Sequence, residues 1–330
     1  MNSILKTIEK DPNCALYLSE SCSSKLVKSY IASTAESRDI CNDPFVTGIR
    51  YTRALSAACA KILKTLNNRG LSNLSEDTTT VLHILRGGLN FGIRDAIFDA
   101  FGWNNHASAF ISAQRTRKAE DSSQWQIIES DYSKFNLKKN NSIILGDVVA
   151  TGTSLSYALD RVITAANENK KSIISSITFF TIGGPRSHEI LEEVCQTLKK
   201  TTPTFKGASV IYLEGIFTVP SKDHPLRIKF DGTDLIRSNA ILTPEFIDSQ
   251  YKSPSYPIER CTIYDAGSRA FDPDEYFEDV KDYWTQTLEL AKKGVSYAEL
   301  LKERFPELDV EKFGKVDLAA IAREQLRKIH

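Results

Sequence analysis

The stretch that decides the fold is NSIILGDVVATGTSLSYA, residues 141–158. It begins with an aliphatic run, residues 143–145, which is typical of a buried parallel strand, and Gly146 and Asp147 follow where such a strand would end. A loop of small and hydroxyl-bearing residues, 150–154, then leads into a segment with apolar residues at helical spacing. Open α/β sheets bind ligands beyond the carboxyl ends of their strands, so the stretch predicts a ligand site.

The ligand that this site favours is an anion. Unpaired N–H groups and the macrodipole at the start of a helix both attract negative charge. The hydroxyls of Thr151, Thr153 and Ser154 offer further hydrogen bonds. The alternative is an ordinary strand, turn and helix in which Ser and Thr only cap the helix.

Residues 80–88, TVLHILRGG, repeat the arrangement of strand, loop and helix. A buried-strand pattern runs directly into Arg86, Gly87 and Gly88, and we expect next a helix with one apolar face that includes Phe98. Glycine lets a backbone approach a ligand closely, and an arginine adds a charge-assisted contact. A glycine turn beside a surface arginine is the alternative.

Three further segments have strand patterns, namely residues 107–114, 172–182 and 208–219. Helical patterns separate most of the strands, which indicates parallel β-α-β units. We therefore predict an α/β fold with a doubly wound parallel sheet of about five strands. Residues 1–44 lack a strong pattern, apart from short helical possibilities around residues 24–33, and are expected to cover the core.

The chain is predicted to have three parts. Residues 45–271 form the sheet domain, which follows the N-terminal covering segment and contains an irregular, proline-bearing insertion at residues 220–260. Residues 272–330 are helical in character, and Ser296 and Glu299 form a capping box. We expect this C-terminal extension to dock its apolar residues on the sheet domain or on a partner.

The composition favours a soluble globular protein. Hydrophobic residues make up 41% of the 330, and 42 basic residues balance 42 acidic ones, which argues against nucleic acid as a partner. No apolar run approaches a membrane span and the N-terminus lacks a signal-peptide pattern, so we expect a cytoplasmic location. The six cysteines, scattered without a C-x-x-C pair, are expected to be reduced thiols.

Both loops resemble motifs of the type I phosphoribosyltransferases, which bind phosphoribosyl pyrophosphate (PRPP), and the motif order is most similar to that of the uracil phosphoribosyltransferases. The resemblance covers roughly residues 45–217 and 261–271. It implies that Asp147 holds the ribose hydroxyls, that residues 150–154 bind the 5′-phosphate, and that the first loop meets the pyrophosphate. The implied PRPP-binding residues are Arg86, Gly87, Gly88, Asp147, Ala150, Thr151, Gly152, Thr153 and Ser154.

Two further segments acquire roles from the same resemblance. Residues 115–139 correspond to a flexible catalytic hairpin, in which Arg115 is expected to contact pyrophosphate, with Arg117 and Lys134 as weaker candidates. The segment YDAGSRAF is similar to the GDAGDRLFG segment of the uracil enzymes, which lies beside the base and ribose. The implied base- and ribose-binding residues are Tyr264, Asp265, Ala266, Gly267 and Arg269.

The resemblance implies an enzyme of nucleotide salvage that transfers the phosphoribosyl group to a nucleobase, favouring a pyrimidine-like base, with Asp147 and Arg115 as catalytic residues. Mg²⁺ would be bound mainly through PRPP, with Asp147 as the one candidate protein ligand. A homodimer is expected.

Two departures from the family pattern leave an alternative open. Gly146 stands where many members have a first acid, and residues 261–264 replace a glycine-bearing base segment. The alternative is a catalytically reduced PRPP or nucleotide sensor that acts through a protein partner, with the C-terminal helices as the candidate surface.

Overall fold

The computed structural model describes residues 5–85, 87–117, 125–129, 132–169, 172–229, 234–259 and 273–329. Within these ranges the strands are β1 (Leu5–Lys10), β2 (Ala15–Ser19), β3 (Val27–Ser33), β4 (Thr79–Leu85), β5 (Ala107–Ser112), β6 (Gln114–Arg117), β7 (Trp125–Glu129), β8 (Ser133–Phe135), β9 (Asn140–Val149), β10 (Ile173–Gly183), β11 (Ala208–Thr218) and β12 (Ile236–Leu242). The α-helices are α1 (Ala35–Asn42), α2 (Gly48–Asn68), α3 (Ile93–Phe101), α4 (Thr153–Glu168), α5 (Arg186–Thr201), α6 (Pro244–Ser249), α7 (Pro273–Lys292), α8 (Tyr297–Arg304) and α9 (Leu318–Lys328). A 3₁₀ turn, η1 (Gly87–Phe91), follows β4.

The main sheet is doubly wound, as predicted. Its order is β1-β2-β3-β11-β10-β9-β4-β5-β8, with β12 beside β11, and the strands from β3 to β5 in this order are parallel. The chain winds outward in both directions from the neighbours β4 and β9, because β4 leads through α3 to β5 and β9 leads through α4, β10 and α5 to β11. The switch point between β4 and β9 is where sheets of this kind bind ligands.

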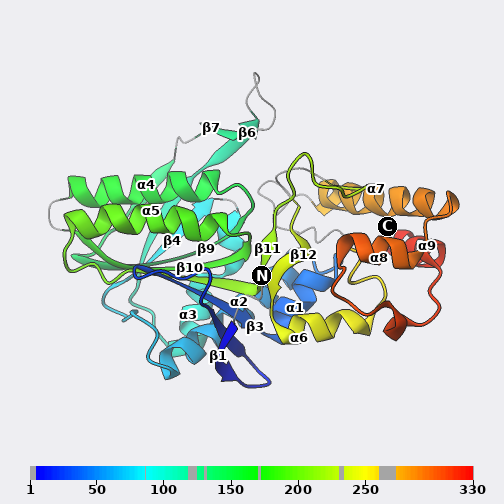
Figure 1. The fold of residues 1–330 in the computed structure, drawn as a ribbon. Coiled ribbons are helices and arrows are strands. Elements are labelled where there is room, and N and C mark those ends of the chain that lie inside the picture. Colours follow the sequence, from blue (N-terminus) through cyan, green and yellow to red (C-terminus); the bar gives the residue numbers. More distant parts are fainter. Residues whose placement is uncertain are drawn as a thin grey trace.

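Helices cover both faces of the sheet, with α4 and α5 on one side and α2 and α3 on the other (Figure 1). Successive side chains of a strand point to opposite faces, so Ile144 of β9 joins the core under α2 and α3 while Leu145 joins the core under α4 and α5. The prediction of one apolar, buried face for α3 is partly wrong, because Ile93 is buried but Phe98 is 52% exposed.

All five predicted strands are present, but the sheet of the described residues has ten. The expectation that residues 1–44 only cover the core is wrong, and so is a helix around residues 24–33. Instead, β3 joins the parallel sheet beside β11, where Ile31 pairs with Tyr212 and is fully buried. Buried Ser29 and Ser33 break the aliphatic pattern by which a buried strand is usually recognised.

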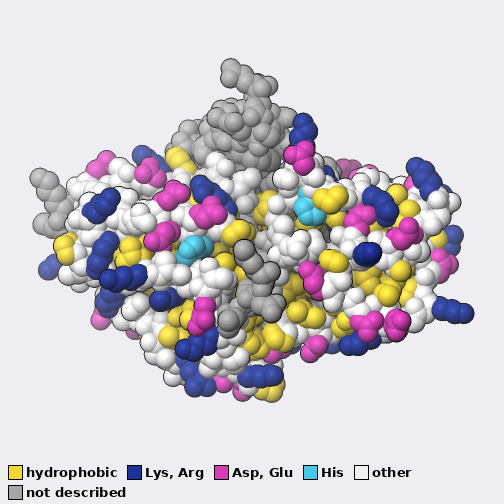
Figure 2. Space-filling view, in the orientation of Figure 1, with side chains coloured by type: hydrophobic (Ala, Val, Ile, Leu, Met, Phe, Trp, Pro, Cys, Tyr) yellow, Lys and Arg dark blue, Asp and Glu magenta, His cyan; other side chains and the backbone are white. Residues whose placement is uncertain are grey.

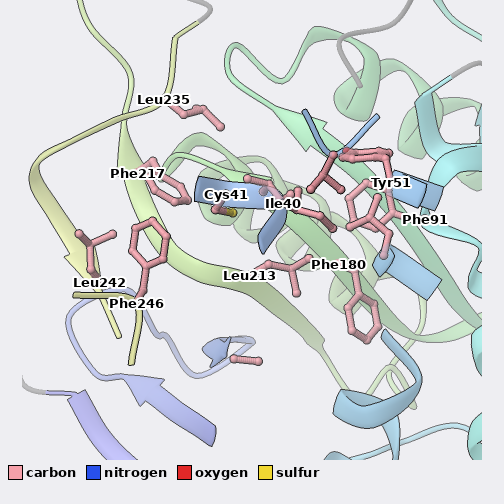
Figure 3. Packing of buried hydrophobic residues seen from close by; sticks show 14 of the residues in the cluster. Ile40, Cys41, Tyr51, Phe91, Phe180, Leu213, Phe217, Leu235, Leu242 and Phe246 are labelled. Atoms are coloured by element: carbon pink, nitrogen blue, oxygen red, sulfur yellow. The ribbon is translucent and has the colours of Figure 1, made fainter. Parts of the chain in front are cut away.

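The segment predicted to be an irregular insertion is more ordered than expected, since it contains β12, antiparallel to β11, and α6. Side chains from α1, β11 and α6 meet there, as Figure 3 shows for Cys41, Phe217 and Phe246. The core is therefore continuous from the sheet into this segment.

The C-terminal helices dock within the chain. Their capping box at Ser296 and Glu299 is confirmed. Trp284 of α7 is fully buried in the same core as Tyr51 of α2, and the hydroxyl of Tyr276 donates to the carbonyl of Pro44 at 2.9 Å. Together with α6 these helices form the second lobe seen in Figure 1.

The surface agrees with the balanced composition. Lys and Arg side chains are interspersed with Asp and Glu over the face shown in Figure 2, so an anionic ligand has to be held by local groups. The five cysteines in the described ranges are free thiols, as expected. Among the helices of those ranges, none combines the length and hydropathy needed to cross a bilayer.

Candidate active site

The first glycine-bearing loop meets strand β9 at the switch point of the sheet. η1 begins directly after β4, and a Cβ added to Gly88 would lie only 2.9 Å from the carbonyl oxygen of Gly146 on β9. Only a residue without a side chain lets the two backbones approach this closely. The predicted pyrophosphate loop and the predicted ribose position are therefore neighbours.

Gly146 itself is covered by an aromatic ring. A Cβ at this position would lie 2.4 Å from Cγ of Phe91, whose side chain is fully buried at the end of η1. Position 146, which the motif resemblance aligns with a first acid, therefore has no room for a side chain. Asp147 is the carboxylate that remains.

Asp147 is half-buried near the end of β9, opposite Thr181 of β10. It lies between Leu145 and Val149, which both pack under α4 and α5, so its side chain is on the same face of the sheet as α4. Its Oδ1 accepts a hydrogen bond from the backbone N–H of Val148 at 3.0 Å. A carboxylate thus lies at the base of the loop that leads into α4.

The loop before α4 leaves its helix without a side-chain cap. Gly152 occupies the N-cap position in the left-handed conformation, with φ of 78°, and no side-chain hydrogen bond caps the helix there. The alternative of ordinary Ser or Thr capping is therefore not what the described residues show. The first N–H groups of α4 are suited to bind an anion.

The hydroxyls of this loop are not equivalent. Oγ1 of Thr151 and Oγ1 of Thr153 lie 3.4 Å apart beside the helix start. Ser154 instead donates from Oγ to the carbonyl of Ala113 at 3.4 Å, a contact that ties the loop to the end of β5. Two of the three predicted hydroxyls therefore pair with each other beside Gly152, and the third binds the end of β5.

The sequence did not predict that the start of α5 packs against this loop. A Cβ at Gly152 would lie 2.3 Å from Cδ1 of Ile190 and 3.3 Å from Cγ of Arg186. The connection before α5 also touches the loop, because the N–H of Gly184 donates to the carbonyl of Val149 at 3.2 Å. The glycine pair at the end of β10 was the signal that could have revealed this packing.

The predicted hairpin is present. β6 and β7 pair antiparallel, with Arg115 opposite Ile127 and Arg117 opposite Trp125, and together they project from the sheet domain (Figure 1). Lys134 is exposed on β8. The remaining predicted site residues lie outside the described ranges, and they are Arg86, Tyr264, Asp265, Ala266, Gly267 and Arg269.

The described side chains of the site could bind Mg²⁺ only together with oxygen atoms of a bound substrate. In the part of the chain that the structure describes, no three His, Cys, Asp or Glu residues come together as a metal site. Mg²⁺ is commonly bound by one or two carboxylates together with substrate phosphates, and Asp147 offers one such carboxylate.

No protein-family model and no curated protein matches the chain. Among solved structures it is similar to a hypoxanthine-guanine phosphoribosyltransferase of L. donovani, at 21% identity over 41% of this chain and 70% of that one, with a TM-score of 0.26. It is also similar to an adenine phosphoribosyltransferase of Trypanosoma brucei, at 13% identity over 69% and 94%, with a TM-score of 0.35. A hypoxanthine phosphoribosyltransferase of Trypanosoma cruzi matches at 14% over 62% and 92%, with a TM-score of 0.25.

All three structures are named as phosphoribosyltransferases, the family that the motifs resemble, and none of the three is a uracil enzyme. Their overlap with this chain is partial. The function has to be inferred from the chain's own site.

Proposed function

We propose that this protein is a phosphoribosyltransferase, which transfers the phosphoribosyl group of PRPP to a nucleobase nitrogen and releases pyrophosphate. The observation that carries the proposal is the meeting of three elements at the switch point of the sheet. These are the Gly87 and Gly88 turn, the half-buried carboxylate of Asp147 and the uncapped start of α4.

The start of α4 is proposed to hold the 5′-phosphate. The N–H groups of the first helical turn point at the ligand, and the macrodipole adds to their attraction for negative charge. Thr151 and Thr153 place their hydroxyls beside these N–H groups. The whole loop is neutral, so these groups act through hydrogen bonding rather than through a formal charge.

Asp147 is proposed to hold the ribose hydroxyls and to face the reacting carbon. Cleavage of the bond to pyrophosphate develops positive charge on the ribose, which a fixed carboxylate stabilises more strongly than it stabilises the neutral sugar. No protein nucleophile is required, since positioning and charge stabilisation account for this type of reaction.

The leaving pyrophosphate would meet the backbone of Gly87 and Gly88, with Arg86 and Arg115 as the candidate cations. Mg²⁺, bound through PRPP and Asp147, would neutralise part of the phosphate charge. Closure of the β6 and β7 hairpin over the site would exclude water, which competes with the base for the ribose.

The identity of the base is what the deciding experiment determines. The sequence favours a pyrimidine-like base, but the residues that would contact it, Tyr264 to Arg269, lie outside the described ranges. The deciding experiment incubates the full chain with PRPP and Mg²⁺ and measures pyrophosphate release with uracil, cytosine, orotate, adenine, guanine and hypoxanthine in turn. Release with at least one base supports the proposal.

A second candidate function is a PRPP or nucleotide sensor. The observation that favours it is the ring of Phe91 over Gly146, which leaves the ribose site with one acid in place of the pair that many members carry. A sensor would bind PRPP in calorimetry and release no pyrophosphate with any base of the panel. The absence of both binding and release would contradict both functions.

A further inference from the structure

Arg186 lies against the loop that is proposed to bind the 5′-phosphate. It is the first residue of α5, and its Cγ lies 3.3 Å from the place that a Cβ of Gly152 would take. Ile190, one turn later on the same face of α5, contacts the same glycine. The aliphatic part of Arg186 therefore packs against the loop at Gly152, and the guanidinium is the charged group at the end of the same side chain.

The loop lacks a cation of its own. Residues 150–154 are Ala, Thr, Gly, Thr and Ser, while a phosphate monoester carries between about one and a half and two negative charges near pH 7. Backbone N–H groups and hydroxyls satisfy its oxygens but leave its charge without a counterion. Arginine is well suited to supply one, because its planar guanidinium donates two parallel hydrogen bonds to phosphate.

The guanidinium of Arg186 has a weak alternative partner. Its Nη1 donates to Oε2 of Glu189 at 2.8 Å and lies 3.7 Å from Oε1 of Glu193. The side chains of Glu189 and Glu193 are 55% and 71% exposed, and ion pairs this open to water contribute little. A doubly charged phosphate can therefore displace these carboxylates from the guanidinium.

We propose that Arg186 is a binding residue for the 5′-phosphate, and that Glu189 holds its guanidinium at the rim of the site until the phosphate enters. This inference rests on the proposed function, because it takes the loop before α4 to be the phosphate site. The inference adds a residue from outside the motif. Arg186 belongs to α5, which follows β10, whereas the motif lies between β9 and α4.

The test measures binding of ribose 5-phosphate to the full chain by calorimetry, with inorganic pyrophosphate as a second probe. Arg186→Ala is expected to weaken ribose 5-phosphate binding about tenfold or more, the loss typical of one hydrogen bond to a charged group. Pyrophosphate binding is expected to stay at the parent value. Arg161→Ala, which removes an exposed arginine of α4, is the matched control and is expected to change neither.

A double-mutant cycle tests the role of Glu189. Glu189→Gln is expected to strengthen ribose 5-phosphate binding in the parent, because it frees the guanidinium, and to have no effect when combined with Arg186→Ala. An equal gain in both backgrounds would show that Glu189 acts without Arg186, which overturns that part of the inference.

Failure of the inference is distinguishable from failure of the proposed function. Thr153→Val removes a loop hydroxyl while keeping the side-chain shape, and it should weaken ribose 5-phosphate binding if the loop is the phosphate site. If Thr153→Val weakens binding and Arg186→Ala does not, the inference alone is wrong. If neither does, the loop is not the phosphate site. An equal loss of both probes in Arg186→Ala would indicate a general charge effect and would also overturn the inference.

Discussion

The ring of Phe91 lies directly over the α-carbon of Gly146. A Cβ at position 146 would approach the ring carbons Cγ and Cδ1 and the methylene Cβ of Phe91 to between 2.4 and 2.7 Å, and the side chain of Phe91 is fully buried. A flexible surface side chain could move aside, but a ring enclosed by the core cannot do so cheaply. The identity of residue 146 is therefore fixed by packing, whatever the site requires chemically.

Gly146→Ala is expected to destabilise the fold by about 1–3 kcal/mol, the usual cost of an extra methyl group in a full core. The same clash applies to Gly146→Asp, which is therefore expected to destabilise the fold rather than to add a second acid to the site. The free energy of unfolding in urea is the measurement. Phe91→Ala should reduce the cost of Gly146→Ala, and strict additivity of the two changes would contradict the contact.

Asp147→Asn is expected to lower the rate of pyrophosphate release by ~10²-fold or more, because it removes a charge aimed at the developing positive centre. The melting temperature should stay close to that of the parent, since the side chain is half-buried and asparagine keeps its shape. Turnover near the parent value with any accepted base would remove Asp147 from the catalytic assignment.

Gly152→Val is expected to abolish PRPP binding and to lower the melting temperature, because the new side chain would clash with Ile190 and so displace the loop that is proposed to hold the phosphate. Gly102→Val is the matched control. Gly102 has a similar φ of 73° but nothing within 4 Å of its Cβ position, so the substitution there carries only the backbone strain. Calorimetry and thermal melts check both variants. A variant at Gly152 that binds PRPP as tightly as the parent would rule out this loop.

Glu214 introduces a pH dependence into the stability of the fold. It is fully buried on β11 with φ of 67°, and its carboxylate accepts hydrogen bonds from Ser33 Oγ at 2.7 Å and from the N–H of Thr34 at 3.2 Å. Thr243 Oγ1 donates to it at 3.3 Å. No cation contacts it directly in the described residues, and Arg38 reaches it only through Ser33. Burial raises the pKa of Glu214 to about 7 from an ordinary value of 4.5.

The folded state holds the proton of Glu214 more tightly than the unfolded state does. The stabilisation of the fold by this proton is therefore complete below pH 4.5 and is lost as the pH rises through 7. The loss is on the order of 3 kcal/mol. The free energy of unfolding of the parent and of Glu214→Gln is measured in urea at several pH values. The parent is expected to lose stability relative to Glu214→Gln as the pH rises across this window. A difference that stays constant from acid to neutral pH would contradict the assignment.

Truncation after Phe271 is expected to lower solubility and melting temperature without removing any residue of the candidate site. It would expose the core that Tyr276 and Trp284 now close. If the truncated chain does not fold at all, Trp284→Ala provides the milder test, with an expected cost of about 3–5 kcal/mol. A truncated chain as soluble and stable as the parent would show that α7 to α9 are dispensable for the fold.

The parts of the fold that could be predicted are those with a local signal. The aliphatic runs that became β4, β9 and β10 each end in small or glycine-containing loops, the run that became β11 ends before a proline, and the capping box of α8 lies within four residues. β3 and β12 lack such a signal because their buried polar groups find partners far along the chain. Ser33 donates to Glu214, and the guanidinium of Arg237 donates to the carbonyl of Glu259 at 2.8 Å.

The same division holds for the site. The spacing of glycine, acid and hydroxyl residues located both loops and Asp147. Phe91 packs on Gly146 and Arg186 packs on Gly152 because of the way distant segments come together in the fold. The spacing of residues within one segment does not encode such contacts. The sequence therefore predicted which segments meet at the switch point of the sheet, but not which neighbouring side chains shape the space around them.

The position of β3 also affects how the chain reaches its fold. Val27 pairs with Ala208, so the parallel neighbour of β3 is synthesised only after most of the chain has left the ribosome. Until then β3 has an unpaired edge, which is a template for association with other nascent chains. Pairing across so long a stretch also slows folding, because the intervening loop must close first. Translation products that stop before β11 are therefore expected to depend on chaperones or to aggregate.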